Sequence, residues 1–152
     1  MKLLRPVFLI CIWLLSGCAT DNNHILDMGN ETQLQKRSYQ SRTFETNDKE
    51  KVLRATISTL QDLGFLIERA DLELGAVSGT KLEGLDKFRI TISVRKKGTD
   101  RMLVRANAQA NVKRAGGAGF IIDIHAIDDP KQYQNFFSLL EKSLFLTAHA
   151  GE

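Results

Sequence analysis

The stretch KFRITISVRKKGTDRMLVRANAQANVK, from Lys87 to Lys113, contains two runs of alternating apolar and polar residues, separated by a short polar turn. Strict alternation over this many residues is typical of β-strands that bury one face and expose the other. When Val94 is placed opposite Val104, and Ile92 opposite Ala106, the apolar faces of the two runs coincide. The stretch therefore predicts two antiparallel strands joined by a hairpin, with one apolar face and one polar face.

The apolar face of the second run is built largely from alanine, at Ala106, Ala108 and Ala110. Such small side chains let a bulky neighbour come close to the sheet. Helices commonly cover the apolar face of an antiparallel sheet. We therefore expect a helix to pack on this face.

One such helix is predicted just before the strands, along Asp48 to Leu63, where apolar residues recur at steps of three and four. Asn47 can cap its first turn, with Glu50 as the second member of a capping box. Gly64 follows the helix, and Phe65 can fold back on Leu60 as in a Schellman motif. The apolar residues that make the buried stripe are Val52, Leu53, Ile57, Leu60 and Leu63.

A second helix is predicted after the strands. Asp129 can cap it, and Pro130 stands at its first position, where proline is best tolerated. Its apolar stripe predicts a buried face that packs on the sheet. The stripe comprises Tyr133, Phe136, Phe137, Leu140 and Leu144, and it could extend to Leu146.

Further segments have the composition of strands, namely residues 39–46, 65–70 and 75–81, and residues 120–127 suit either a short last strand or a tucked loop. Together the segments predict an α+β fold. Its antiparallel sheet carries two helices packed on one face, in the order β-α-β-β-β-α.

The beginning of the chain has the pattern of an export signal. Lys2 and Arg5 precede the apolar run Val7 to Leu15, which is shorter than the roughly 20 apolar residues that a transmembrane helix needs. The run ends in Leu15-Ser16-Gly17-Cys18. This tetrapeptide resembles the lipobox of bacterial lipoproteins.

The lipobox resemblance implies cleavage before Cys18, which would then be the lipidated first residue of the mature chain. Ala19 stands where an Asp would favour retention in the inner membrane, so the resemblance implies an outer-membrane, periplasm-facing protein held by its lipid. Two or more acyl chains anchor a protein stably. The alternative is a plain signal peptide in which Cys18 is a chance thiol.

This interpretation divides the chain into a signal peptide at residues 1–17, a lipidated cysteine with a flexible tether at 18–37, and one domain at 38–152. The alternative for the tether is that Ile25 to Met28 docks onto the domain or a partner. Cys11 would leave with the signal, so the mature chain would hold no thiol for a disulfide or a nucleophile. Loss of two cations from the 21 Lys and Arg leaves 19 against 18 acidic residues, which does not favour nucleic-acid binding.

Candidate chemistry is sparse. The three histidines, His24, His125 and His149, lack the spacing of a metal site. Asp123 and His125 would share a strand face within the cluster Asp123 to Asp129, but Asp128 and Asp129 are explained by helix capping. The glycine-containing segments 79–81 and 116–119 lack the order of a phosphate-binding loop. We therefore expect no catalytic residue, no metal and no cofactor.

The polar face of the predicted sheet is a stronger candidate for a binding site than these clusters are for a catalytic site. Arginine and amide side chains at alternate positions could bind a protein, a glycan strand or an anionic headgroup. The same face could equally be the solvated side of an antiparallel sheet. Its candidate binding residues are Arg89, Arg95, Arg105, Asn107, Gln109, Asn111 and Lys113.

The order of the Asn47-capped helix, Leu63-Gly64-Phe65, the hairpin through Gly75 and the helix opening at Pro130 is similar to that of a group of small uncharacterised proteobacterial lipoproteins. More remotely, it resembles the helix-grip domains of the lipoprotein C subunit of the outer-membrane β-barrel assembly machine. The resemblances imply a periplasm-facing, non-enzymatic binding or scaffolding module, and we expect it to bind a protein partner of an outer-membrane assembly or transport machine. The alternatives are a peptidoglycan or small-ligand binder, and an envelope hydrolase.

Overall fold

The computed structural model describes residues 32–117 and 119–149, with the side chains of 32–117 and 119–146. Cys18 and most of the predicted tether lie outside the described residues. The elements are α2 (Gln33–Tyr39), β1 (Ser41–Phe44), α3 (Lys49–Asp62), β2 (Leu66–Asp71), β3 (Ala76–Glu83), β4 (Asp86–Lys97), β5 (Arg101–Gly116), β6 (Gly119–Ala126) and α4 (Pro130–His149).

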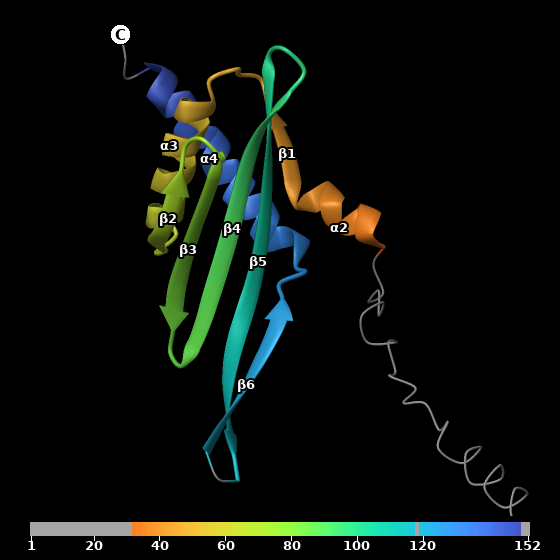
Figure 1. Cartoon of the computed structure of the whole chain (residues 1–152), viewed down its shortest axis with the longest axis vertical. Helices are drawn as coiled ribbons and strands as arrows, with labels where there is room; N and C mark the ends of the chain where they lie inside the picture. The colour runs from red at the N-terminus through yellow and green to blue at the C-terminus, as the bar shows by residue number, and fades with distance from the viewer. Residues whose placement is uncertain (1–31, 118, 150–152) are drawn as a thin grey trace, which may run out of the picture. The chain divides into compact units, whose positions relative to one another are not determined.

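The six strands form one antiparallel sheet in the order β1-β5-β4-β3-β2, with β6 also pairing with β5. Helices α3 and α4 lie on one side of this sheet (Figure 1). The predicted α+β class is confirmed, and so is the packing of these two helices on one face. The predicted element order changes, because five strands rather than three separate α3 from α4, and the short helix α2 precedes β1.

The β4–β5 hairpin has the predicted register. Val94 lies opposite Val104, and Ile92 lies opposite Ala106. All four side chains are fully buried on the face that the helices cover. The alternation of apolar and polar residues thus sets both the pairing of the strands and the face that becomes the core.

The ends of the helices are fixed by side chains and backbone turns. Asp48, rather than the predicted Asn47, caps α3, because its carboxylate accepts a hydrogen bond from the Lys51 N–H at 2.9 Å. The predicted Schellman motif is present, since the Phe65 N–H donates to the Leu60 carbonyl at 2.9 Å and Gly64 has a φ of 81°.

Asp129 caps α4 as predicted, with its carboxylate accepting from the Lys131 N–H at 2.9 Å. The buried stripe of α4 does not reach Leu146, the last residue to which the sequence analysis extends it. Leu140 is fully buried and Leu144 is half-buried against the core, but Leu146 is 57% exposed. The extension to Leu146 is therefore wrong, because the apolar period continues where the helix no longer has the core beneath it.

The core lies between the sheet and the two helices. Its largest fully buried side chains come from α3, α4 and the three central strands, so each layer contributes to it. They are Phe137, Leu60, Ile92, Met102, Leu140, Val52, Val77, Val94 and Val104.

Strand β5 is the longest strand and carries two neighbours on the same edge. β1 pairs with its first part, opposite Met102 to Arg105, and β6 pairs with its last part, opposite Gln109 to Gly116. Between them, the Ala106 N–H donates to the Gln40 carbonyl, and the Ile127 N–H donates to the Ala108 carbonyl, each at 2.9 Å. One edge of β5 is therefore hydrogen-bonded along nearly its whole length.

Helix α2 lies at the described end of the segment that the sequence predicts to be a tether. Its Tyr39 ring packs against Tyr133 with centroids 5.5 Å apart, and Lys36 forms an ion pair with Asp128. Residues 33–37 are therefore helical and are held at the start of α4.

Candidate functional site

The seven predicted binding residues share one face of the sheet. All occupy odd-numbered positions of β4 and β5, whereas the core side chains of these strands occupy even-numbered positions. Because side chains alternate along a strand, the seven lie on the face opposite to α3 and α4. We call this face, with its residues Arg89, Arg95, Arg105, Asn107, Gln109, Asn111 and Lys113, the open face.

The strand register places the members of the open face beside one another. Arg89 lies opposite Gln109, and Thr91 lies opposite Asn107. Directly opposite residues in antiparallel strands have Cβ atoms about 5 Å apart, close enough to bind one ligand group together. The structure thus brings together on one face the polar residues that the sequence predicted as a set.

Glu68 on β2 offsets part of the positive charge of the open face. Its carboxylate lies 3.4 Å from the Arg89 guanidinium and 3.7 Å from the Lys87 ammonium. Glu68 sits at an irregularity in the β2–β3 pairing, between Ile67 and Arg69. Both contacts are partly exposed, so solvent weakens them and Arg89 remains able to exchange this partner for another.

Two polar atoms of the open face are buried without a hydrogen-bond partner among the described residues. They are Nε of Arg105 and Oδ1 of Asn111. A buried polar group without a partner typically costs about 1–3 kcal/mol. Because neighbouring atoms cover both of them, a bound molecule could reach this donor and this acceptor only after the covering side chains move.

An apolar stripe borders the open face, and sequence reasoning missed it. The register puts Ile124 opposite Asn111, Ile122 opposite Lys113 and Phe120 opposite Ala115, so these β6 side chains project from the same face. Their exposed fractions are 61%, 56% and 67%. Residues 120–124 do not alternate, and their apolar character suggested burial, so only the pairing of β6 with β5 shows which side chains share the open face.

The Asp123 and His125 pair offers no assembled catalytic site. Both lie on the opposite face of β6 and are exposed, and the Asp123 carboxylate lies 3.9 Å from the Arg114 guanidinium. No group of three His, Cys, Asp or Glu residues within residues 32–117 and 119–149 could hold a metal ion. His24 lies outside the described residues.

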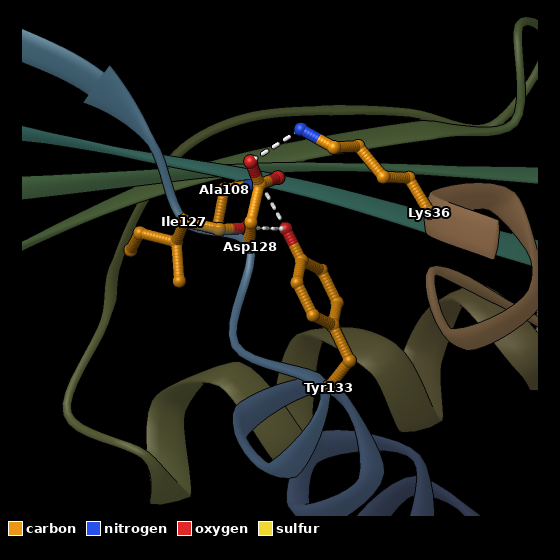
Figure 2. A network of polar contacts seen from close by, with 5 residues as sticks. All are labelled: Lys36, Ala108, Ile127, Asp128 and Tyr133. Atoms are coloured by element: carbon orange, nitrogen blue, oxygen red, sulfur yellow. Dashed lines mark hydrogen bonds and ion pairs between the residues drawn. The ribbon is translucent and has the colours of Figure 1, made fainter. Parts of the chain in front are cut away.

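Asp128 does not cap α4, contrary to the prediction, and instead belongs to a polar network at the start of that helix (Figure 2). Its carboxylate accepts from Lys36 at 2.5 Å. The Tyr133 hydroxyl donates to the Ile127 carbonyl at 2.8 Å and accepts from the Ala108 N–H at 3.1 Å. The network ties α2, β5 and α4 together, so its role is structural.

Burial of Tyr133 raises the pKa of its phenol above the ordinary value of 10.0. The hydroxyl therefore stays protonated at neutral pH and can keep donating to Ile127. The ring lies over the alanine face of β5, where Ala106 and Ala110 are buried. The Tyr133 side chain, rather than a close approach of the α4 backbone, thus occupies the space over these alanines.

A hollow of about 280 Å³ lies on the helix side, next to the end of α3. Phe65, Phe88 and Phe136 contribute to its apolar lining, and Lys81 stands at its polar part. The Lys81 ammonium is already paired with Glu83 at 2.6 Å. The hollow is therefore mainly apolar and has little free charge.

The glycine-containing segments take structural positions. Gly79 is buried inside β3, where a Cβ would lie 3.0 Å from the Leu66 carbonyl oxygen. Gly116 and Gly119 are paired at the end of the β5–β6 hairpin. Neither segment opens a helix, as a phosphate-binding loop does.

Within the described part of the chain, no helix has both the length and the apolar character needed to cross a membrane. Comparisons with known proteins were negative: no protein-family model matches the chain, and no curated protein matches it.

Proposed function

We propose that the chain is a lipid-anchored lipoprotein of the bacterial outer membrane, whose domain binds a protein partner on the periplasmic side through the open face. The proposal for the anchor rests on the sequence Leu15 to Cys18, behind a basic and then an apolar segment. The proposal for binding rests on one structural observation: the seven polar side chains share a face that α3 and α4 leave uncovered.

The composition of this surface favours a protein partner. Guanidinium and amide groups can bind carboxylates and backbone groups of a protein in defined geometry. The apolar stripe of Phe120, Ile122 and Ile124 adjoins them and supplies area whose burial is favourable. Protein interfaces contain both apolar and polar contact area, and this surface offers the two side by side.

Lipidation is tested by labelling cells with a radioactive fatty acid. The wild-type chain is expected to incorporate the label, and Cys18→Ser is expected to incorporate none, because the thiol is the acylated atom. Cys11→Ser is the matched control, since it changes the other cysteine and should leave the label in place. Equal labelling of wild type and Cys18→Ser would contradict the proposed anchor.

Binding through the open face is tested by placing a photoreactive amino acid at Gln109 in the cell. Gln109 is exposed on the open face, and Gln134 is an exposed glutamine on α4. We expect a discrete protein adduct from position 109 and none from position 134. Arg89→Ala with Asn107→Ala should abolish this adduct, because both side chains lie next to Gln109 on the same surface.

Failure of position 109 to form a protein adduct would contradict the protein-binding proposal. A separate measurement distinguishes the glycan alternative, namely retention of the protein on purified peptidoglycan sacculi. Retention that is lost on changing Arg89, Arg105 and Asn107 to Ala would assign the open face to peptidoglycan instead.

A further inference from the structure

Strand β6 has hydrogen-bonding groups that the described sheet leaves unused. β6 pairs with β5 on one side, and no described strand lies beyond it. All eight of its residues are exposed. Its sequence GFIIDIHA holds neither proline nor lysine, the residues that commonly protect a sheet edge from pairing with another chain.

The pairing with β5 determines which β6 residues turn their backbone outward. The Ile127 N–H donates to the Ala108 carbonyl directly opposite, so this pair is hydrogen-bonded. In antiparallel strands the backbone groups of successive residues point alternately to the two sides. Odd-numbered residues of β6 therefore bond to β5, and Phe120, Ile122 and Ile124 direct their N–H and C=O groups to the free edge.

The same three residues place their side chains on the open face. Their backbone groups and apolar side chains thus offer a strand-binding edge with an apolar row beside it. The row has equal spacing about Ile122, with one large apolar residue two positions before it and one two positions after it.

We propose that β6 pairs antiparallel with β6 of a second copy of this chain, with Ile122 opposite Ile122 across a twofold axis. In this register Phe120 of each copy lies opposite Ile124 of the other, so every outward residue meets an apolar one. Such an interface is isologous, because the same residues face each other on both sides of the axis.

Apolar contact and charge favour this register over its two neighbours, because a centre at Ile121 would pair Phe120 with Ile122 and leave Ile124 without a partner from the row. Residues whose backbone groups point outward must pair with one another, so the register shifts in steps of two residues. The nearest alternatives therefore place the twofold axis at Ile121 or at Asp123 instead of Ile122. A centre at Asp123 would place two Asp123 carboxylates directly opposite each other, which is unfavourable. A centre at Ile122 instead sets Asp123 opposite Ile121, where it keeps its own Arg114 at 3.9 Å.

Pairing in this way would join two sheets edge to edge, with both open faces on the same side. The inference concerns β6 alone and does not depend on the lipid anchor or on a protein partner at the open face.

The test is disulfide formation in the cell envelope between full-length chains that carry one added cysteine. Across the proposed pair, the two Ile122 Cα atoms would be about 5.5 Å apart, within the range that a disulfide spans. The two Ile121 Cα atoms would be offset by two residues and about 8 Å apart, beyond that range. We expect Ile122→Cys to give a reducible dimer, and Ile121→Cys and wild type to give none.

Mixed chains test the register independently. Co-expressed Phe120→Cys and Ile124→Cys chains, distinguished by tags, are expected to form a disulfide with each other, but neither is expected to form one when expressed alone. All substituted residues are more than half exposed, so the fold should tolerate the changes.

Three results would overturn the inference. The first is a monomer from Ile122→Cys after oxidation, and the second is equal cross-linking from Ile121→Cys, which would indicate random collision. The third is a disulfide between Ile122→Cys and a different polypeptide, which would show that β6 accepts a strand from another protein.

Discussion

Gly75→Ala is expected to destabilise the domain by roughly 2–5 kcal/mol, because the new methyl group meets both a backbone penalty and a steric clash. Gly75 has a φ of 67°, in the left-handed region that L-residues avoid. A Cβ at this position would collide with the carbonyl oxygen of Val94. That backbone is fixed in β4, where the Val94 N–H donates to the Gly75 carbonyl at 2.7 Å.

Gly84→Ala is the matched control for this prediction. Gly84 also has a positive φ, 62°, but nothing lies within 4 Å of the Cβ that it would acquire. Gly84→Ala should therefore lower the unfolding free energy only by the penalty for a left-handed backbone conformation, about 1–2 kcal/mol. Urea unfolding of both variants gives the comparison, and equal losses of unfolding free energy would show that the clash at Gly75 is relieved by movement.

Phe137→Ala should be the second strongly destabilising change, with an expected loss of about 3–5 kcal/mol. Phe137 is 1% exposed and is among the largest fully buried side chains of the core. Its removal leaves a cavity beneath α4 and takes away the edge contact with Phe136 at 5.1 Å between centroids. It also removes the ring that lies 5.3 Å from the Arg42 guanidinium carbon.

Phe145→Ala makes the same chemical change on the same helix, at a residue that is 62% exposed. Its effect should stay within about 0.5 kcal/mol, because surface changes remove little packing. Thermal or urea unfolding measures both variants. A loss from Phe145→Ala as large as that from Phe137→Ala would mean that burial does not decide the stability of α4.

The elements with a strong period could be predicted from the sequence. The alternation around Ile92 and Val104 sets the hairpin register, since a slip of one residue would expose the apolar set. The glycine after Leu63 fixes the end of α3, because only its left-handed conformation closes the helix in this way. These features depend on local chemistry, so the folded chain reproduces them.

Other features depend on tertiary context and were missed. Asn47 and Asp48 can both cap a helix, and only the backbone geometry selects Asp48. The apolar residues of β6 suggested a buried segment, but the β5–β6 hairpin continues past the start of α4 and receives no covering layer (Figure 1). The sequence predicted which polar residues share the open face. It did not predict the pairing of β6 with β5, which places the apolar stripe beside them.

The long strand β5 also has a consequence for the order of folding. Each strand from β2 to β5 is paired with the next strand along the chain, so β2 to β6 can form as a succession of local hairpins. β1 is different, because Phe44 must find Met102 after a loop of more than fifty residues has closed. Non-local pairing of this kind is slow. We therefore expect the meander to form first, with β1 docking late on an edge of β5 that the hairpins have already shaped.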